Sequence, residues 1–113
     1  MERLSFADGY EPDSPLLAGV TIAPLTSPIR AGAPFQAAVF RLGPGGRIAR
    51  HPAAVPQLLA VLEGSGVVSG SDRVEEPIGV GEAVVWDEGE EHETRTDVGL
   101  VALILEGRGL LLG

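Results

Sequence analysis

Short apolar segments separated by turn-forming residues run through most of the chain. From residue 35 onward they read FQAAVFRL, RIARH, QLLAVLE, GVVSG, RVEEPI, EAVVWD, HETRT and GLVALILE. Most are β-branched or alternate between apolar and polar positions, and Gly, Pro, Asp or Ser separates each from the next. This spacing predicts an all-β fold, an antiparallel sandwich or barrel.

Two regions are less clear from the pattern alone. The segment PQLLAVLE (56–63) contains strong helix formers and a proline suited to a first helical turn, but it is short and a glycine ends it. Periodicity therefore does not decide whether this segment is a helix or a strand. Residues 1–34 are irregular and punctuated by proline, with LSF (4–6) and GVTIAPL (19–25) as candidate short strands. We expect one domain, with an N-terminal arm at 1–34 and a barrel at 35–113.

Composition narrows the function classes. The chain has 113 residues, which suits one domain, and its 44% hydrophobic content argues against disorder. A net charge of −8 disfavours binding to nucleic acid and to anionic membranes. The sequence contains no cysteine and no lysine, which excludes thiolate and Schiff-base chemistry. No signal peptide or long apolar run is present, so we expect a cytoplasmic protein.

The candidate chemistry centres on the only two histidines of the chain, His51 and His92. Each lies in a block of regularly spaced glycines and polar residues. The first block contains Gly45, His51, Ala53, Gln57 and Gly64, and the second contains Gly81, Asp87, Gly89, His92 and Thr96.

These two blocks resemble the two-part signature of the cupin superfamily, G-x5-H-x-H-x3-E-x6-G followed by G-x5-P-x-G-x2-H-x3-N. The four glycines and both histidines match, while Ala53, Gln57, Asp87 and Thr96 depart from the pattern. The resemblance covers residues 35–105 in the expected order. It implies a double-stranded β-helix, which is a small jelly-roll barrel, and it places 56–63 in a strand. Small cupins commonly exchange N-terminal strands, so it also implies a homodimer, with apolar contacts from residues before Pro24 or from the tail at 110–113.

Metal-binding cupins take two histidines and a glutamate from the first block and one histidine from the second. Carried over by position, the ligand slots here are His51, Ala53, Gln57 and His92. Alanine cannot bind a metal, and the glutamine carbonyl is a weak neutral ligand. The resemblance therefore implies a weak, open site of His51, His92 and Gln57 that suits Zn, Ni, Fe or Cu better than Mn or Mg. A pocket without metal is the alternative.

Strand alternation indicates which other side chains face the barrel interior. It predicts Ala53, Leu59, Val61 and Thr94 as pocket-lining residues, whereas Glu93 and Arg95 face outward. Val84 and Trp86 should share one face, and the resemblance places Trp86 toward the barrel interior, so both are also expected to line the pocket. The carboxylates of the DEGEEHE turn (87–93) are expected to form a solvated rim, with a raised pKa at His92 as the alternative. Arg47 and Arg50 flank His51 and are expected to pair with surface acids rather than with an anionic ligand.

Three functions follow from this site. The first is a cupin that binds a small molecule beside a degenerate divalent-metal site, with metal-dependent chemistry on an oxygen-chelating anionic metabolite such as an enol, a keto acid or a catechol-like compound. The second is a non-enzymatic ligand-binding or sensory module without metal. The third is a metal-free isomerase or epimerase with a histidine base. It ranks last because the only tyrosine, Tyr10, lies outside the matched region.

Overall fold

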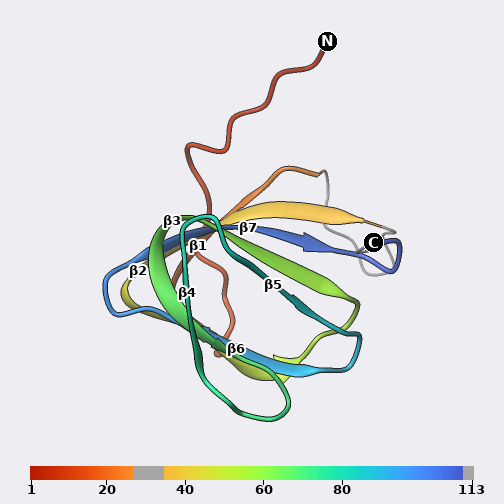
Figure 1. Cartoon of the computed structure of the whole chain (residues 1–113). Helices are drawn as coiled ribbons and strands as arrows, with labels where there is room; N and C mark the ends of the chain where they lie inside the picture. Colours follow the sequence, from red (N-terminus) through yellow and green to blue (C-terminus); the bar gives the residue numbers. More distant parts are fainter. Residues whose placement is uncertain (27–34, 111–113) are drawn as a thin grey trace.

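The computed structural model describes residues 1–26 and 35–110, and within these ranges every regular element is a strand (Figure 1). The strands are β1 (Leu17–Pro24), β2 (Gln36–Pro52), β3 (Gln57–Ser69), β4 (Glu76–Gly79), β5 (Ala83–Trp86), β6 (Glu91–Arg95) and β7 (Leu100–Glu106). The all-β prediction is confirmed. Across the described ranges no helix has the length and apolar character needed to pass through a membrane.

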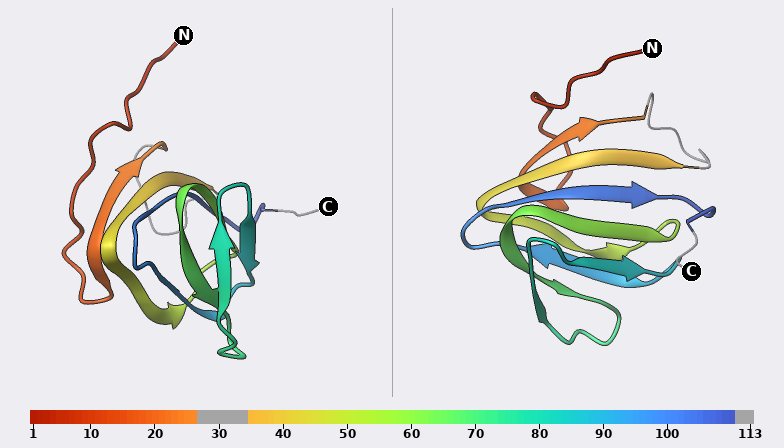
Figure 2. Two further views of the ribbon diagram at one scale, coloured as in Figure 1. Left: turned by 60° about the vertical axis from the view of Figure 1, so that its left-hand side comes forward. Right: turned by 45° about the horizontal axis from the view of Figure 1, so that its top comes forward.

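Two long strands close the barrel. The first part of β2 pairs with β7 and its last part with β6, while β3 likewise pairs first with β7 and then with β6. β2, β7, β3 and β6 therefore form a closed ring of antiparallel ladders, which the two views in Figure 2 show as a barrel. β1 adds to the outside edge of β2, and β4 and β5 both add to β3.

The sequence predicts that the first barrel strand stops at GPGG (43–46), and this is wrong. β2 continues through these glycines for 17 residues. The Gly45 N–H donates to the Thr96 carbonyl, and the Thr96 N–H donates to the Gly46 carbonyl, so the segment stays paired across the bend. Gly45 has a φ of 80°, which glycine adopts without strain. The glycines therefore bend β2 from one side of the barrel to the other instead of ending it.

Three other segments test the sequence analysis. PQLLAVLE contributes to β3, as the resemblance implies, and β3 continues through GSG to include the separate strand expected at GVVSG. The strand expected at residues 19–25 is confirmed as part of β1, which begins two residues earlier and ends one residue earlier. The prediction of a strand at LSF (4–6) is wrong, because these residues form no ladder with another strand and the first residues extend away from the barrel (Figure 1). Leu4 and Phe6 are accordingly 61% and 47% exposed.

Inward-facing apolar side chains fill the barrel below its mouth. Leu59, Leu100 and Ile104 are each no more than 2% exposed and lie on β3 and β7. Their strands are apolar because both sides of this part of the barrel wall are covered or half-buried. Residues 111–113 of the predicted dimer-forming tail lie outside the described residues.

Candidate functional site

The two histidines face each other across one antiparallel ladder. His51 near the end of β2 is the register partner of His92 on β6. Their ring centroids are 4.4 Å apart, with an angle of 51° between the planes. Residues 41 positions apart in the sequence thus form one pair of imidazoles at the mouth of the barrel.

A backbone carbonyl fixes each imidazole through the same ring nitrogen. Nδ1 of His51 lies 2.7 Å from the Ala49 carbonyl oxygen, and Nδ1 of His92 lies 3.1 Å from that of Glu90. A carbonyl oxygen only accepts, so Nδ1 is the protonated nitrogen of each ring in its neutral form and Nε2 then carries a lone pair. The Nε2 atom of His92 is buried and has no hydrogen-bond partner within the described part of the chain.

His92 is held in its neutral form. It is 2% exposed, and burial lowers its pKa below the ordinary value of 6.5. The hydrogen bond to Glu90 and the charge of Glu90 oppose this shift, but they are weaker than the desolvation. The alternative expectation, that the acidic turn raises this pKa, is therefore wrong, because burial outweighs the carboxylates.

The donor set of this pair fits a transition metal only in part. Histidines that bind metal usually do so through one ring nitrogen while the other is hydrogen-bonded to the protein. Both rings here have this arrangement, with Nδ1 hydrogen-bonded and Nε2 available. In residues 1–26 and 35–110, however, no three His, Cys, Asp or Glu side chains are grouped to hold a metal ion. An ion here would have two imidazole ligands and would need water, an amide oxygen or a bound molecule to complete its shell.

A cavity of about 140 Å³ lies beside His51. Its polar residues are His51, Gln57, Glu106 and Ser14, and its apolar residues are Leu16, Leu17, Phe40 and Ile48. Gln57 is 9% exposed and faces this cavity, which agrees with the inward direction expected from alternation.

Sequence reasoning missed Glu106. It ends β7, whose alternation places Leu100, Ala102 and Ile104 inside the barrel and therefore Glu106 as well. Burial raises the pKa of its carboxyl group, and the nearby charge of His51 lowers it by less. The alternation contained this signal, but the motif comparison directed attention only to the two histidine blocks.

Glu106 belongs to a row of large polar side chains around the barrel mouth. It is the register partner of Gln36 on β2 and of Gln57 on β3, and Gln57 is in turn the partner of Trp86 on β5. The Trp86 ring centroid lies 4.5 Å from that of His92, which continues the row to the histidine pair. The row therefore consists of Gln36, Glu106, Gln57, Trp86, His92 and His51.

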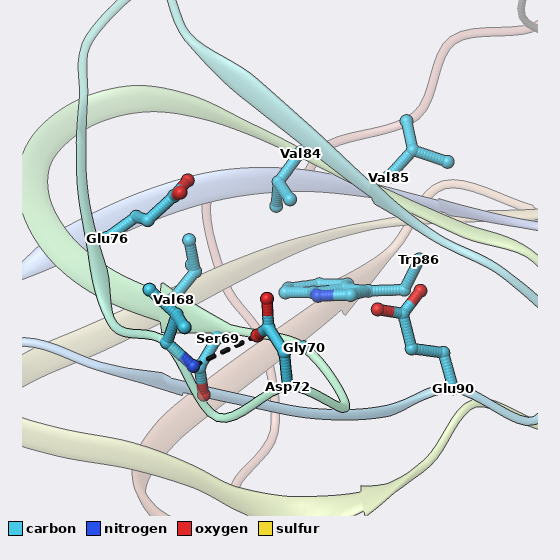
Figure 3. A pocket seen from close by; sticks show the side chains of 10 residues that line it. Val68, Ser69, Gly70, Asp72, Glu76, Val84, Val85, Trp86 and Glu90 are labelled. Atoms are coloured by element: carbon cyan, nitrogen blue, oxygen red, sulfur yellow. Dashed lines mark hydrogen bonds between the residues drawn. The ribbon is translucent and has the colours of Figure 1, made fainter.

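The other residues expected to line the pocket have different positions. Ala53, Leu59, Val61 and Thr94 are between 1% and 4% exposed and pack in the interior, and the walls beside His51 come from β1, β2 and β7 instead. Val84 and Trp86 line a second pocket of about 140 Å³ together with Asp72, Glu76 and Glu90. Figure 3 shows the Trp86 indole in this pocket, with the carboxylates of Asp72 and Glu90 beside it. Trp86 thus separates this pocket from His92.

The two arginines beside His51 both have protein partners. Arg47 forms an exposed ion pair with Glu93 at 3.4 Å, as expected. Arg50 differs, because its guanidinium donates to the Gly70 carbonyl at 2.8 Å and to the Ser69 hydroxyl rather than to an acid. These bonds fix the turn after β3 against the end of β2.

Solved structures with a similar backbone are numerous, although no protein-family model matches the chain and no curated protein matches its sequence. A cupin-like protein from Thermotoga maritima has a TM-score of 0.81 at 20% identity, over 92% of this chain and 80% of that one. The polyketide cyclase RemF from Streptomyces resistomycificus has a TM-score of 0.78 at 24% identity, over 100% and 87%. A predicted oxalate decarboxylase from Thermotoga maritima has a TM-score of 0.67 at 24% identity, over 76% and 77%.

At these identities the likeness concerns the backbone. It extends over at least 76% of this chain in each of the three comparisons. The protein therefore has the cupin fold, a double-stranded β-helix barrel.

Proposed function

We propose that the protein binds a small organic molecule at the mouth of its barrel, beside the imidazoles of His51 and His92. The observation that carries this proposal is the shared orientation of the two rings. Both Nδ1 atoms are held by backbone carbonyls, and the buried Nε2 atom of His92 has no hydrogen-bond partner among the residues that the structure describes. A buried acceptor without a partner costs free energy, which a ligand supplied from outside recovers.

A divalent transition metal is the first candidate for that ligand. His51 and His92 would hold it through Nε2, with Gln57 assisting through its amide oxygen or a water molecule. Imidazole ligands suit Zn, Ni, Fe or Cu better than Mn or Mg. When bound, such an ion polarises an oxygen atom of the organic molecule and favours oxygen-chelating compounds such as enols, keto acids and catechol-like molecules. With so few protein ligands, binding is weak and weakens further in acid, because protonated imidazole does not bind metal.

The residues of the chain itself would orient the molecule. Leu17, Phe40 and Ile48 form an apolar wall that excludes water, and Glu106 and Gln57 offer hydrogen-bonding groups opposite. The names of two backbone neighbours, a polyketide cyclase and a predicted oxalate decarboxylase, support a small oxygen-rich molecule as the ligand of this fold.

Catalysis without metal is the second candidate, and one observation favours it. Tyr10 lines a cavity of about 210 Å³ that also contains Glu106, and Glu106 shares the other cavity with His51. A tyrosine, a carboxyl group and a histidine near one molecule suit proton transfer in an isomerase or epimerase. A binding or sensory module without chemistry would use the same residues only for recognition.

Calorimetric titration of tag-free protein with zinc or nickel at neutral pH separates these candidates. We expect heat from the wild-type protein and from Glu93→Gln, whose side chain neighbours His92 in the sequence but faces outward. We expect none from His92→Ala. Equal heat in all three proteins, or no heat in any, would reject the metal site and leave the metal-free candidates.

We also propose that the protein is a homodimer. The exposed side chains of Met1, Leu4 and Phe6 lie on a segment that extends away from the barrel (Figure 1). The outward face of β3 and β5 carries the exposed Leu62 and Val85. A second copy would cover such apolar groups by symmetric contacts.

A further inference from the structure

Two cavities adjoin along the inner side of β1, β2 and β7. One, of about 140 Å³, contains His51 and Gln57, and the other, of about 210 Å³, contains Tyr10 and Ile22. Phe40 and Glu106 line both of them. The cavities therefore meet at these two side chains.

Two polar side chains at this junction, those of Glu106 and Gln57, have no hydrogen-bond partner among the described residues. The Glu106 carboxyl group has no hydrogen bond or ion pair with any described residue, although its burial is enough to shift its pKa. The Gln57 side-chain amide, which is 9% exposed, likewise has no hydrogen bond within the described ranges. Both side chains line the first cavity, so a molecule bound there, or water, can supply the hydrogen bonds that the described residues do not.

The missing partner must bring hydrogen-bond donors. In the first cavity, the carboxyl oxygens of Glu106, the amide oxygen of Gln57 and the Nε2 lone pair of His51 are acceptors, and the Gln57 amide group is the main donor. The donors of the second cavity, the Tyr10 hydroxyl and the Gln36 amide, lie on the other side of Glu106. A carboxylate or phosphate ligand would place its negative charge against Glu106. A neutral hydroxyl group donates to the carboxyl oxygen and accepts from the Gln57 amide, so it fits both.

The walls on either side of the junction are apolar and suit flat groups. Leu16, Leu17 and Ile48 line the first cavity. Ile22, Ala38 and Ile104 line the second, where Tyr10 and Gln36 add polar groups at its edge. An apolar cavity of about 150 Å³ is large enough for a benzene ring. The two cavities, about 140 and 210 Å³, therefore each accommodate one ring.

We propose that the two cavities form one elongated site for a flat molecule of two rings, whose hydroxyl group is bound by Glu106 and Gln57 beside the Phe40 ring. The proposal rests on the proposed binding of a small organic molecule at the barrel mouth, and it names the class of that molecule, a two-ring phenol. It needs no metal. Glu106 selects for a hydroxyl donor, and the apolar walls select for the ring system.

The test is the binding of 2-naphthol, measured by calorimetry and by ligand-observed NMR, both in the presence of a chelator. We expect the wild-type protein to bind 2-naphthol at least about tenfold more tightly than 2-methoxynaphthalene, which has no donor, because a hydrogen bond to a charged acceptor carries a discrimination of that order. It should also prefer 2-naphthol to 2-naphthoate. Equal binding of 2-naphthol and 2-methoxynaphthalene, or preference for the carboxylate, would overturn the proposal.

Variants separate the role of Glu106 from general damage to the fold. Glu106→Met keeps the length of the side chain and removes the acceptor, and we expect it to weaken 2-naphthol about tenfold while leaving 2-methoxynaphthalene unchanged or tighter. Glu63→Met replaces an exposed glutamate on the neighbouring strand β3 and should leave both affinities unchanged. Circular dichroism and melting temperature check that both variants fold. Equal loss in both variants, or no loss in Glu106→Met, would reject the role of Glu106.

This experiment also distinguishes the two proposals from each other. Zinc binding that depends on His92, together with no binding of 2-naphthol, would overturn the phenol site and leave the metal site intact. Binding of 2-naphthol that depends on Glu106, without any zinc binding, would support the phenol site and reject the metal.

Discussion

The indole of Trp86 lies against the imidazole of His92, with ring centroids 4.5 Å apart and an angle of 31° between the planes. Trp86 is the only tryptophan of the chain. Its fluorescence therefore reports on the histidine that is most deeply buried in the candidate site.

Fluorescence of Trp86 should follow the protonation of His92. Charged imidazole quenches a neighbouring indole, and burial lowers the pKa of His92, so we expect quenching with a midpoint below pH 6.5. The measurement is a fluorescence titration in the presence of a chelator. His92→Gln should abolish this transition, and a midpoint at or above pH 6.5 would contradict the neutral, desolvated state of His92.

Folding stability should fall in mild acid because of the same group. A histidine with a lower pKa in the folded state binds fewer protons than it does unfolded, so the free energy of unfolding decreases as pH falls from 6.5 through the folded-state pKa. Urea unfolding at a series of pH values measures this slope. We expect His92→Gln to reduce the slope in that interval, and an unchanged slope would assign the effect to other groups.

Glu106 should change folding stability with pH in the opposite direction to His92. Its pKa is raised in the folded state, so its contribution to stability is present below pH 4.5 and is lost as pH rises through the folded-state pKa. We therefore expect Glu106→Gln to be more stable than the wild-type protein at neutral pH and to lose this advantage in acid. Glu63→Gln, on the exposed side of β3, is the matched control and should show no such dependence.

A third imidazole should strengthen the metal site. Ala53 is 4% exposed and occupies the slot where the cupin pattern has a histidine, whereas its neighbour Ala54 is exposed. We expect Ala53→His to bind zinc at least about tenfold more tightly than the wild-type protein, which is the usual effect of even an outer-shell partner. The melting temperature should fall without zinc and recover with it. Ala54→His should change neither value, and an equal gain in both variants would indicate adventitious surface binding.

Shortening a core side chain below the site should lower the free energy of unfolding. Leu59 is 1% exposed on β3, so Leu59→Ala should lower the free energy of unfolding by about 2–5 kcal/mol. Leu62 lies three residues further along the same strand and is 47% exposed. Leu62→Ala should change stability by no more than about 0.5 kcal/mol. Similar losses in both variants by urea unfolding would contradict the inward direction of Leu59.

The assembly state has a direct measurement. Light scattering at high micromolar concentration should give the mass of a dimer, and removal of residues 1–9, which carry Met1, Leu4 and Phe6, should shift the equilibrium toward the monomer. A monomeric mass for the full chain would reject the proposed homodimer.

Local patterns were enough to predict the fold class and the inward residues of most strands. Alternation from His92 predicted that Thr94 faces inward, and Thr94 is 1% exposed, because one face of the strand is buried and side chains alternate with a period of two. The family resemblance, not alternation, placed Trp86 toward the interior, where it is 2% exposed. The sequence pattern did not predict where the strands end. Glycines at 43–46 and at 64 and 66 read as breaks, but in the structure they are bends where hydrogen bonds to distant residues continue.

The candidate site was predicted in part. The motif spacing found His51, His92 and Gln57, because a family pattern records residues that meet in space. Glu106 was missed because its place in the site depends on the register between β7 and β3, which pairs it with Gln57 across 49 positions of sequence. No local pattern contains that register.

In the ring of β2, β7, β3 and β6, both β6 and β7 are hydrogen-bonded on each side, to β2 and to β3, while β1, β4 and β5 occupy the outside edges of β2 and β3. Displacing β6 or β7 therefore breaks ladders on both sides of the strand, while β1, β4 and β5 can detach from one neighbour alone. Amide hydrogen exchange should accordingly divide the chain into two classes, with slow protons in the ring that exchange only through global unfolding and faster ones in the three outer strands. A guest molecule must then enter through an end of the barrel, at a rate set by side-chain motion and not by unfolding of the backbone.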